Sequence, residues 1–212
     1  MFTVTVQPVN DPPSFTMGPD RSVDENCGAV TVTGWATDIS AGPADETDAG
    51  LAFTVTTDND ALFDQLPTVS AAGDLSFTPA TDMSGSAIVT VVLSDGEDET
   101  AARTFSIVVN PVIEPPSFTI GADQDVDEDC GEVMVSGWAT AVSAGPADES
   151  GQTVTFTVST DNDDLFALLP SIDATGVLSF TPADNANGSA TVTVALSDDG
   201  GTTNGGDDSA DP

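Results

Sequence analysis

The sequence contains no histidine, lysine or tyrosine, and Arg21 and Arg103 are its only basic side chains. Proteins that bind nucleic acid neutralise its phosphates with clustered lysine and arginine, and anionic membrane surfaces attract the same residues. The 212-residue chain instead carries a formal charge of −34. We therefore exclude nucleic acid and anionic membranes as partners, and we expect cations to be the main counterpart of this surface.

The same absences remove most of the side chains that catalyse reactions. General acid–base chemistry would have to rely on Asp and Glu, and nucleophilic chemistry on Ser, Thr and two Cys. Paired carboxylates can cleave glycosidic bonds. However, every close pair here lies in a predicted turn and recurs in both halves of the chain, and small domains of this kind rarely offer a deep, dry pocket. We predict that the protein is not an enzyme.

Long apolar runs and paired cysteines are also missing. No run approaches the ~20 residues that span a bilayer, and the sequence shows no basic segment followed by an apolar signal region. Cys27 and Cys130 are 103 residues apart, at equivalent places of a repeat, so a bridge between them is geometrically unfavourable. Without histidine or paired cysteines a zinc site is excluded. We expect two free, partly buried thiols.

The chain does contain an internal repeat. Residues 7–15 (QPVNDPPSF) return as residues 110–118 (NPVIEPPSF), at an offset of 103. Three prolines in each copy exclude helix and remove backbone donors, which predicts a stiff, extended joint. We predict that residues 1–7 are the closing strand of a preceding repeat that is absent. The first full repeat would then span residues 8–113 and the second residues 114–212.

Short β-branched segments separated by turns fill each repeat, without helical periodicity. The first repeat has strand-like segments at residues 15–17, 30–36, 52–56, 62–69, 73–78, 86–93 and 104–109. This pattern predicts an all-β fold of two tandem antiparallel Ig-like or cadherin-like β-sandwiches. Gly34 is expected to mark a bulge that turns Trp35 inward. Residues 199–212 contain no apolar strand, so the second sandwich is predicted to lack its closing strand.

The two ends of the chain are therefore complementary. Residues 1–6 form a strand without a domain, and the second repeat is a domain without its last strand. Strand exchange between chains, head to tail, is one interpretation, and such a contact would build filaments. The other interpretation is a frayed boundary with no pairing.

Acidic residues cluster at recurring places: before the second strand, in the long loop after it, after the penultimate strand, and at the joint. Calcium takes six to eight oxygen ligands in irregular geometry, which loop carboxylates can supply. Loops after alternate strands of a sandwich gather at one end, so these acids are predicted to converge near the joint. The alternative is an acidic, solvated surface without bound metal.

Several phrases resemble a known family: VDEN at 23–26, ATD at 36–38, LSD at 93–95 and VNDPPSF at 9–15. They resemble the cadherin repeat and, more closely, the bacterial cadherin-like, tandem-95-type repeats of large secreted adhesins. This resemblance implies calcium at the joints. The ligands it implies at the central joint are Glu25, Asn110, Glu114, Asp148, Glu149 and Asp198. Those at the first joint are Asn10, Asp11, Asp38, Asp45, Glu46 and Asp95.

The sequence departs from the family at some of these places. Asp38 becomes Ala141 in the second repeat, and the joint there has Val112 and Ile113 before Glu114. The Asp-Arg-Glu motif of animal cadherins is absent, and Asp82 lies near its expected position.

The resemblance implies a calcium-stiffened stalk or spacer of an extracellular or cell-surface bacterial adhesin. Its partners would be neighbouring repeats and cell-surface polysaccharide or another cell. The alternative function is a polysaccharide-binding β-sandwich module of a secreted protein. Such a module usually exposes a row of aromatic rings, whereas we expect Trp35 and Trp138, the only tryptophans, to be buried.

Overall fold

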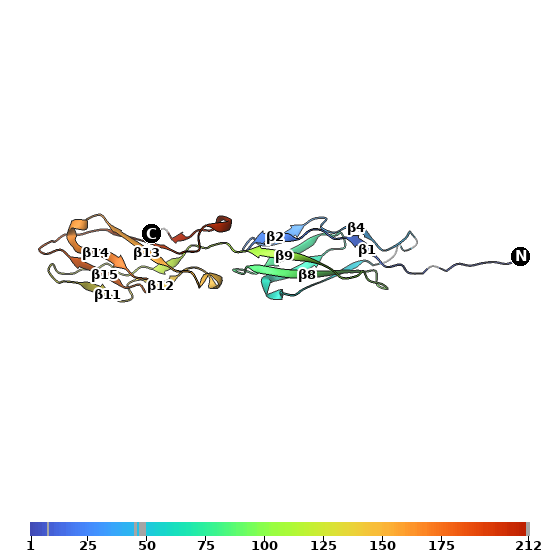
Figure 1. Cartoon of the computed structure of the whole chain (residues 1–212), viewed down its shortest axis with the longest axis horizontal. Helices are drawn as coiled ribbons and strands as arrows, with labels where there is room; N and C mark the ends of the chain where they lie inside the picture. The colour runs from blue at the N-terminus through green and yellow to red at the C-terminus, as the bar shows by residue number, and fades with distance from the viewer. Residues whose placement is uncertain (8, 45, 47–49, 211–212) are drawn as a thin grey trace. The chain divides into compact units, whose positions relative to one another are not determined.

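The computed structural model describes residues 1–7, 9–44, 46 and 50–210. The chain divides into two compact units, Met1–Pro111 (unit 1) and Val112–Pro212 (unit 2), and both are built from β-strands (Figure 1). Helical structure in the described residues consists of 3-10 turns, η1 (Asp60–Leu62), η2 (Ala147–Glu149), η3 (Asp163–Leu165) and η4 (Thr203–Gly205). Within these ranges, no helix has the length and apolar character needed to cross a membrane.

Unit 1 contains two main sheets that pack around one core. The first sheet has the order β2 (Arg21–Asp24), β9 (Arg103–Asn110), β8 (Gly85–Ser94), β5 (Ala52–Thr57). The second has the order β3 (Val30–Val32), β7 (Leu75–Pro79), β6 (Phe63–Val69), and β1 (Ser14–Thr16) pairs separately with β4 (Thr37–Ser40). This arrangement confirms the predicted all-β, Ig-like sandwich.

The core of unit 1 follows from the alternation of side chains along its strands. Every second residue of β8 and β9 is buried, including Val89, Val91, Phe105 and Ile107, because successive side chains of a strand point to opposite faces. These residues meet Leu75 and other apolar residues of the second sheet in a single cluster. β9 thus lies at the centre of one sheet and supplies a full row of core side chains.

Two strands of unit 1 lie outside the set predicted from the sequence. β2 pairs with β9 in parallel, whereas β8 pairs with both β9 and β5 antiparallel. β4 lies in a segment that we predicted as an acidic loop, and Asp38 in this strand has a positive φ of 51°. Both strands are short and only partly buried, so neither has the apolar alternation that reveals a strand in a sequence.

The prediction for Trp35 is correct. The strand before it ends at Val32, and Gly34 adopts a positive φ of 64°, a conformation that glycine reaches without steric cost. The following indole is buried at 4% exposure, and its Nε1 donates a hydrogen bond to the carbonyl oxygen of Pro19 at 3.0 Å.

Unit 2 repeats the second sheet of unit 1 and shortens the first. The sheet β11 (Val133–Val135), β15 (Leu178–Pro182), β14 (Phe166–Ile172) and the pair β10 (Ser117–Thr119), β12 (Thr140–Ser143) match their counterparts. The other sheet is β13 (Thr155–Thr160), β16 (Val192–Ser197), β17 (Ser209–Ala210). β17 pairs only with Leu196 and Ser197, the counterparts of Leu93 and Ser94, whereas eight-residue β9 pairs with residues 85–91 of β8. Among the described residues, no strand of unit 2 takes the place of β9.

Three further features differ from the sequence-based expectations. Trp138 is only half-buried, whereas we expected it to be buried like Trp35. Both cysteines are free, as expected, but they are exposed rather than partly buried. Cys27 lies in a turn between Asn26 and Gly28, both with positive φ, and this turn directs it outward. Residues 1–7 form no strand, because a β-strand needs a partner and none lies beside them in the described part of the chain.

Candidate cation site

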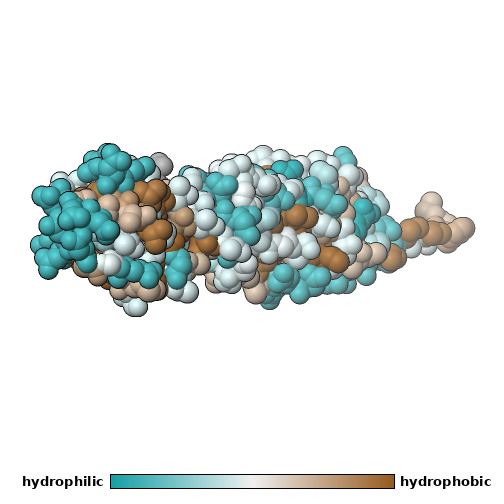
Figure 2. Space-filling model, turned by 60° about the vertical axis from the view of Figure 1, so that its left-hand side comes forward, coloured by the Kyte–Doolittle hydropathy of each residue, from teal (hydrophilic) through white to brown (hydrophobic). Residues whose placement is uncertain are grey.

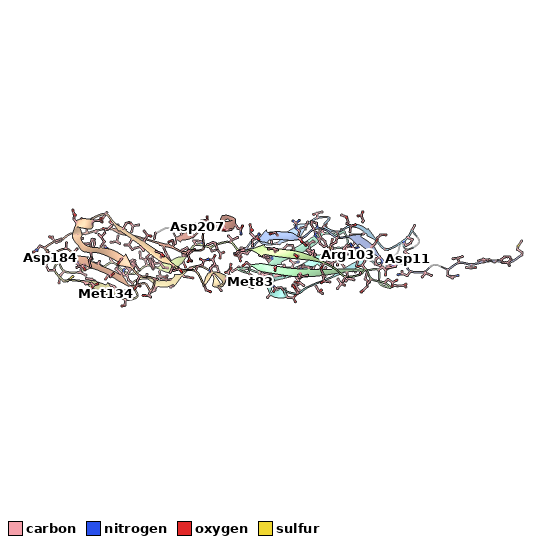
Figure 3. All side chains as sticks on the ribbon, in the orientation of Figure 1. Asp11, Met83, Arg103, Met134, Asp184 and Asp207 are labelled. Atoms are coloured by element: carbon pink, nitrogen blue, oxygen red, sulfur yellow. The ribbon has the colours of Figure 1, made fainter. Side chains whose placement is uncertain are left out.

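The residues that lead into β1 are tied to two acidic loops of unit 1. Asn10 donates from Nδ2 to Asp95 Oδ2 at 3.3 Å and to Asp98 Oδ2 at 3.0 Å. The backbone N–H of Asp11 donates to Glu46 Oε1 at 2.5 Å. Figure 3 shows Asp11 toward the same end of unit 1 as Arg103, where β9 begins. The sequence-predicted residues Asn10, Asp11, Glu46 and Asp95 therefore lie at one end of the sandwich.

Asp95 is the most strongly held carboxylate of this group. It is buried, and its Oδ1 accepts the backbone N–H groups of Asp98 at 2.7 Å and Glu97 at 2.8 Å. These backbone donors, that of Asp98 first and that of Glu97 second, lower the pKa of Asp95 from its ordinary value. Asp95 is therefore ionised at neutral pH, and its carboxylate holds the β8–β9 loop through these two hydrogen bonds.

A glycine makes room for the loop glutamate in each unit. A Cβ atom at Gly42 would overlap Glu46 Oε2, and one at Gly145 would overlap Glu149 Oε2. Ser40 and Ser143, two residues before the glycines, accept the glycine N–H at Oγ, at 3.3 Å in both units. The repeated phrase SAGPADE (40–46 and 143–149) is thus a local fold that bends the chain and returns its glutamate over the glycine.

Unit 2 has the same arrangement with a more buried glutamate. Glu149 is 5% exposed, and its Oε1 accepts the backbone N–H of Glu114 at 3.0 Å. The neighbouring Thr153 donates its backbone N–H to Asp199 Oδ1 at 2.7 Å, which places the loop containing Asp198 and Asp199 at the same end of the unit. Asp198 Oδ1 accepts the N–H of Gly200 at 2.8 Å.

Several acceptor oxygens at these two ends are buried without a hydrogen-bond donor in the described part of the chain. They are Glu46 Oε2 in unit 1, and Glu149 Oε2, Asp198 Oδ2 and Gln152 Oε1 in unit 2. An ionised carboxylate cannot donate, and burying one without a partner is costly. The chain has no lysine or histidine, and Arg103 lies with its guanidinium 5.4 Å from the ring centroid of Phe15. These oxygens are the kind of ligand that a hard divalent cation prefers.

Glu25 and Asn110 meet within unit 1, at the ends of β2 and β9. The backbone N–H of Glu25 donates to the carbonyl oxygen of Asn110 at 2.9 Å, and Glu25 is 4% exposed. The amide Nδ2 of Asn110 donates to Asp24 Oδ1 at 3.0 Å and to Ser22 Oγ at 3.1 Å. These backbone and side-chain hydrogen bonds hold the end of β2 beside the end of β9.

The remaining predicted ligands are not joined to these clusters by any hydrogen bond among the described residues. Asp38 is exposed and accepts a bond from the Thr37 hydroxyl at 3.3 Å. Asp148 is exposed in η2, and Asp45 lies outside the described residues. In the ranges that the structure describes, no three His, Cys, Asp or Glu side chains are grouped so as to hold a metal ion. Bound metal therefore remains a prediction.

One repeated pair was missed by sequence reasoning. Asn26 Nδ2 donates to Asp82 Oδ1 at 3.0 Å, and the Asp82 N–H donates to Asn26 Oδ1 at 3.0 Å. In unit 2 the residue types are exchanged, and the N–H of Asn185 donates to Asp129 Oδ1 at 2.8 Å. All four residues have positive φ. Asp82 thus joins the turn that contains it to the turn that contains Asn26. The sequence signal that could have revealed this pair is the exchange of Asn and Asp between the two repeats, at the offset of 103.

Comparisons with solved structures give distant matches. They include a SusE-like surface located polysaccharide binding protein from the Bacteroides thetaiotaomicron heparin utilisation locus (12% identity, TM-score 0.35, 88% of this chain and 31% of that chain). They also include the human desmocollin-1 ectodomain (13%, 0.35, 92% and 35%) and immunoglobulin domains 1–4 of Sidekick-1 (16%, 0.37, 93% and 47%). The chain thus spans about a third to a half of these structures. No curated protein matches the sequence.

A family match covers most of unit 1. The family model is described as a bacterial Ig domain, and it matches residues 10–108. This range starts at Asn10, which donates hydrogen bonds to Asp95 and Asp98, and it ends within β9. The match supports an Ig-like repeat for this part of the chain.

Proposed function

We propose that the chain is a non-catalytic repeat segment of an extracellular bacterial surface protein, that it serves as a spacer in cell adhesion, and that calcium binds the acidic end of each unit. Two Ig-like units in tandem and a match to a bacterial Ig domain support the spacer. The observation that carries the calcium proposal is Glu149, which is 5% exposed with Oε2 lacking a hydrogen-bond donor among the described residues.

The residues fit calcium by chemistry and by location. The candidate ligands are carboxylate and amide oxygens on three segments of each unit. These segments are the residues before the first strand, the SAGPADE loop, and the loop after β8 in unit 1 or β16 in unit 2. Calcium tolerates irregular oxygen ligation of this kind, whereas magnesium requires near-ideal octahedral geometry. Because the acids that the structure describes are not grouped as a ready ligand set, ion binding would have to draw these loops together.

Ion binding would have a mechanical consequence. The segment before β1 is held in unit 1 by Asn10 and by the backbone of Asp11, and the one before β10 is held in unit 2 by the backbone of Glu114. An ion ligated by the same loops would fix these proline-rich segments to their sandwich and reduce repulsion among the acids. A repeat with a fixed lead-in segment is a stiffer element of a spacer.

A thermal melt with excess calcium, magnesium or chelator at fixed high ionic strength tests the proposal. An ion that binds only the folded state at 100 times its Kd adds about 2.7 kcal/mol, which for a unit of this size is roughly 10–20 °C in Tm. We expect this rise with calcium and not with magnesium. Glu149→Gln should reduce the rise for unit 2. Asp164→Asn, which removes the same charge from an exposed position of η3 in the same unit, should not. Superimposable melts in calcium and chelator would show that the acids are only a solvated surface.

Polysaccharide binding is the second function that the sequence suggested, and the aromatic side chains do not favour it. Trp35 is buried, and among the described residues Phe2 is the one exposed aromatic side chain. Trp138 is half-buried in a groove, with Nε1 donating to the carbonyl oxygen of Ala122 at 2.9 Å. A flat row of exposed rings is absent from the described residues. Sugar-dependent protection of tryptophan from iodide quenching would support this alternative.

A further inference from the structure

Gln152 contacts both acidic loops of unit 2. Its backbone N–H donates to the carbonyl oxygen of Glu149, the last residue of the SAGPADE loop, at 2.9 Å. Its side-chain amide lies against Gly200, in the loop that follows β16. A Cβ atom at Gly200 would come within 2.5 Å of Gln152 Nε2 and within 2.8 Å of Oε1. The next residue, Thr153, donates its backbone N–H to Asp199 of the same loop at 2.7 Å. Gln152 therefore lies where the two loops meet.

Gly200 serves the amide rather than the backbone. It is not one of the glycines with positive φ, so the turn itself could be formed by another residue type. Its counterpart in unit 1, at the offset of 103, is Glu97. In unit 2 any side chain at this position would overlap the amide of Gln152. The glycine in one loop and the glutamine in the other therefore belong together.

An amide side chain lies against this loop in both units, but it comes from different segments. In unit 1 the amide is that of Asn10, before β1, whose Nδ2 donates to Asp95 Oδ2 at 3.3 Å. The counterpart of Asn10 in unit 2 is Ile113, which has no polar side chain. The counterpart of Gln152 in unit 1 is Ala49, which lies outside the described residues. The repeat thus keeps an amide at this loop while its position in the sequence has changed.

The exchange leaves a group of oxygens in unit 2 without a donor among the described residues. They are Gln152 Oε1, Glu149 Oε2 and Asp198 Oδ2. Asp198 is the counterpart of Asp95, whose Oδ2 accepts the amide of Asn10 in unit 1. Glu149 is 5% exposed, and the other two side chains are half-buried. Oxygen acceptors cannot satisfy one another, whereas a cation can satisfy all three.

These oxygens differ from the many exposed acids of unit 2. Figure 2 shows hydrophilic residues covering the end of unit 2 at which Figure 3 places Asp184, and Asp184 is exposed. Exposed carboxylates are hydrated by bulk water and screened by dissolved salt, so they do not require an ion at a fixed place. The oxygens around Gln152 have little contact with bulk water, so a bound ion would stabilise them more.

We propose that Gln152 ligates the ion of unit 2 through Oε1, together with Glu149 and Asp198, and that it takes the place of the amide that Asn10 supplies in unit 1. This inference rests on the proposed calcium binding. Calcium accepts amide oxygens as well as carboxylates, and water can complete its ligand shell. The set contains only two carboxylates, which agrees with the lack of a group of three acids among the described residues.

Two substitutions at Gln152 test its role in a Trp35→Phe chain, where Trp138 is the single tryptophan and reports on unit 2. The Kd for calcium is obtained from the calcium dependence of the Trp138-detected Tm. Gln152→Met keeps a side chain of similar length without the oxygen, and we expect its Kd to be about tenfold higher. Gln152→Glu adds a charged ligand, and we expect its Kd to be about tenfold lower. In chelator the same variant should melt below wild type, because three carboxylates then repel one another.

Two control variants locate the effect. Gln124→Glu makes the same change at an exposed glutamine of unit 2, and it should leave the Kd of unit 2 unchanged. Asn10→Ala should also leave unit 2 unchanged. In a Trp138→Phe chain, where Trp35 reports on unit 1, Asn10→Ala should instead weaken the calcium response.

The outcomes separate this inference from the calcium proposal. If wild-type unit 2 responds to calcium and Gln152→Met has the same Kd, Gln152 is not a ligand and the calcium proposal stands. A Gln152→Met variant whose Tm falls equally in calcium and in chelator shows that the side chain only packs or holds a water molecule, which also overturns the inference. A unit 2 whose Tm does not respond to calcium overturns both proposals.

Discussion

Truncating Phe105 measures how much the closing strand stabilises a unit. Phe105 is 3% exposed, lies opposite Val89 in β8 and has its ring centroid 4.4 Å from that of Trp35. Replacing a buried phenylalanine by alanine costs about 3–5 kcal/mol through lost transfer energy and a residual cavity. The pairing with Trp35 accounts for about 0.5–1.5 kcal/mol of this. We therefore expect Phe105→Ala to lower the free energy of unfolding of unit 1 by about 3–5 kcal/mol.

Phe2→Ala is the matched control, because Phe2 occupies the equivalent position of the repeat and is 88% exposed. In dilute protein it should change stability by no more than about 0.5 kcal/mol. Both variants would be measured by urea unfolding in a Trp138→Phe chain, where Trp35 reports on unit 1 alone. With a slope of about 2 kcal/mol per molar urea, Phe105→Ala should lower the midpoint by about 2 M.

The comparison can refute the reasoning. Equal midpoints for the two variants, or a shift below about 0.5 M for Phe105→Ala, would mean that β9 does not hold the core around Trp35.

Three further predictions concern single positions. Because backbone donors of the β8–β9 loop lower the pKa of Asp95, its contribution to stability is complete above the ordinary value of 3.8 and is lost as the pH falls through the lowered value. The urea-measured gap between wild type and Asp95→Asn should therefore close on acidification from pH 7 to pH 2. Gly145→Ala, whose Cβ would overlap the carboxylate of Glu149, should cost about 1–3 kcal/mol, whereas Gly151→Ala, with open space around it, should change little. Both cysteines are exposed and should react with a thiol reagent in the folded protein as fast as a free thiol does.

The sandwich could be predicted from the sequence because its long strands alternate cleanly. β5, β7, β8 and β9 were located to within about two residues, since burial of alternate side chains leaves a visible period. β6 was also located, although its burial does not alternate throughout. β2 and β4 could not be found, because β2 is defined by its parallel pairing with a strand more than 80 residues away and β4 contains a left-handed residue. Pairing of this kind depends on tertiary structure, which local sequence does not reveal.

The candidate site was only partly predictable. The sequence could indicate which acids lie in loops, and the structure shows which of them are turned inward: Glu46 and Glu149 return over a glycine, and Asp95 folds its own loop. Asp38 and Asp148 belong to the same acidic clusters but are exposed. The difference depends on bonds such as the one from the Gly145 N–H to Ser143 Oγ. The phrase SAGPADE contains both partners of this bond, but the sequence does not reveal in which direction the loop then turns its glutamate.

The internal repeat separates residues that shape the backbone from residues that can bind an ion. Asp38 and Ala141 have the same φ of 51°, so this left-handed position does not depend on a carboxylate. In both units the backbone N–H of the later residue, Asp82 or Asn185, donates to Oδ1 of the earlier one, Asn26 or Asp129, so an amide or a carboxylate serves at either position. Neither position therefore requires charge.

At Glu46 and Glu149, by contrast, both units place a carboxylate over a glycine. One oxygen of each carboxylate accepts a backbone N–H from the segment before the first strand of its unit. A neutral glutamine could accept that backbone bond equally well. In the calcium proposal the charge serves the second carboxylate oxygen, which would ligate the ion. Glu149→Gln, which keeps the backbone bond and removes the charge, is therefore the sharpest single substitution for that proposal.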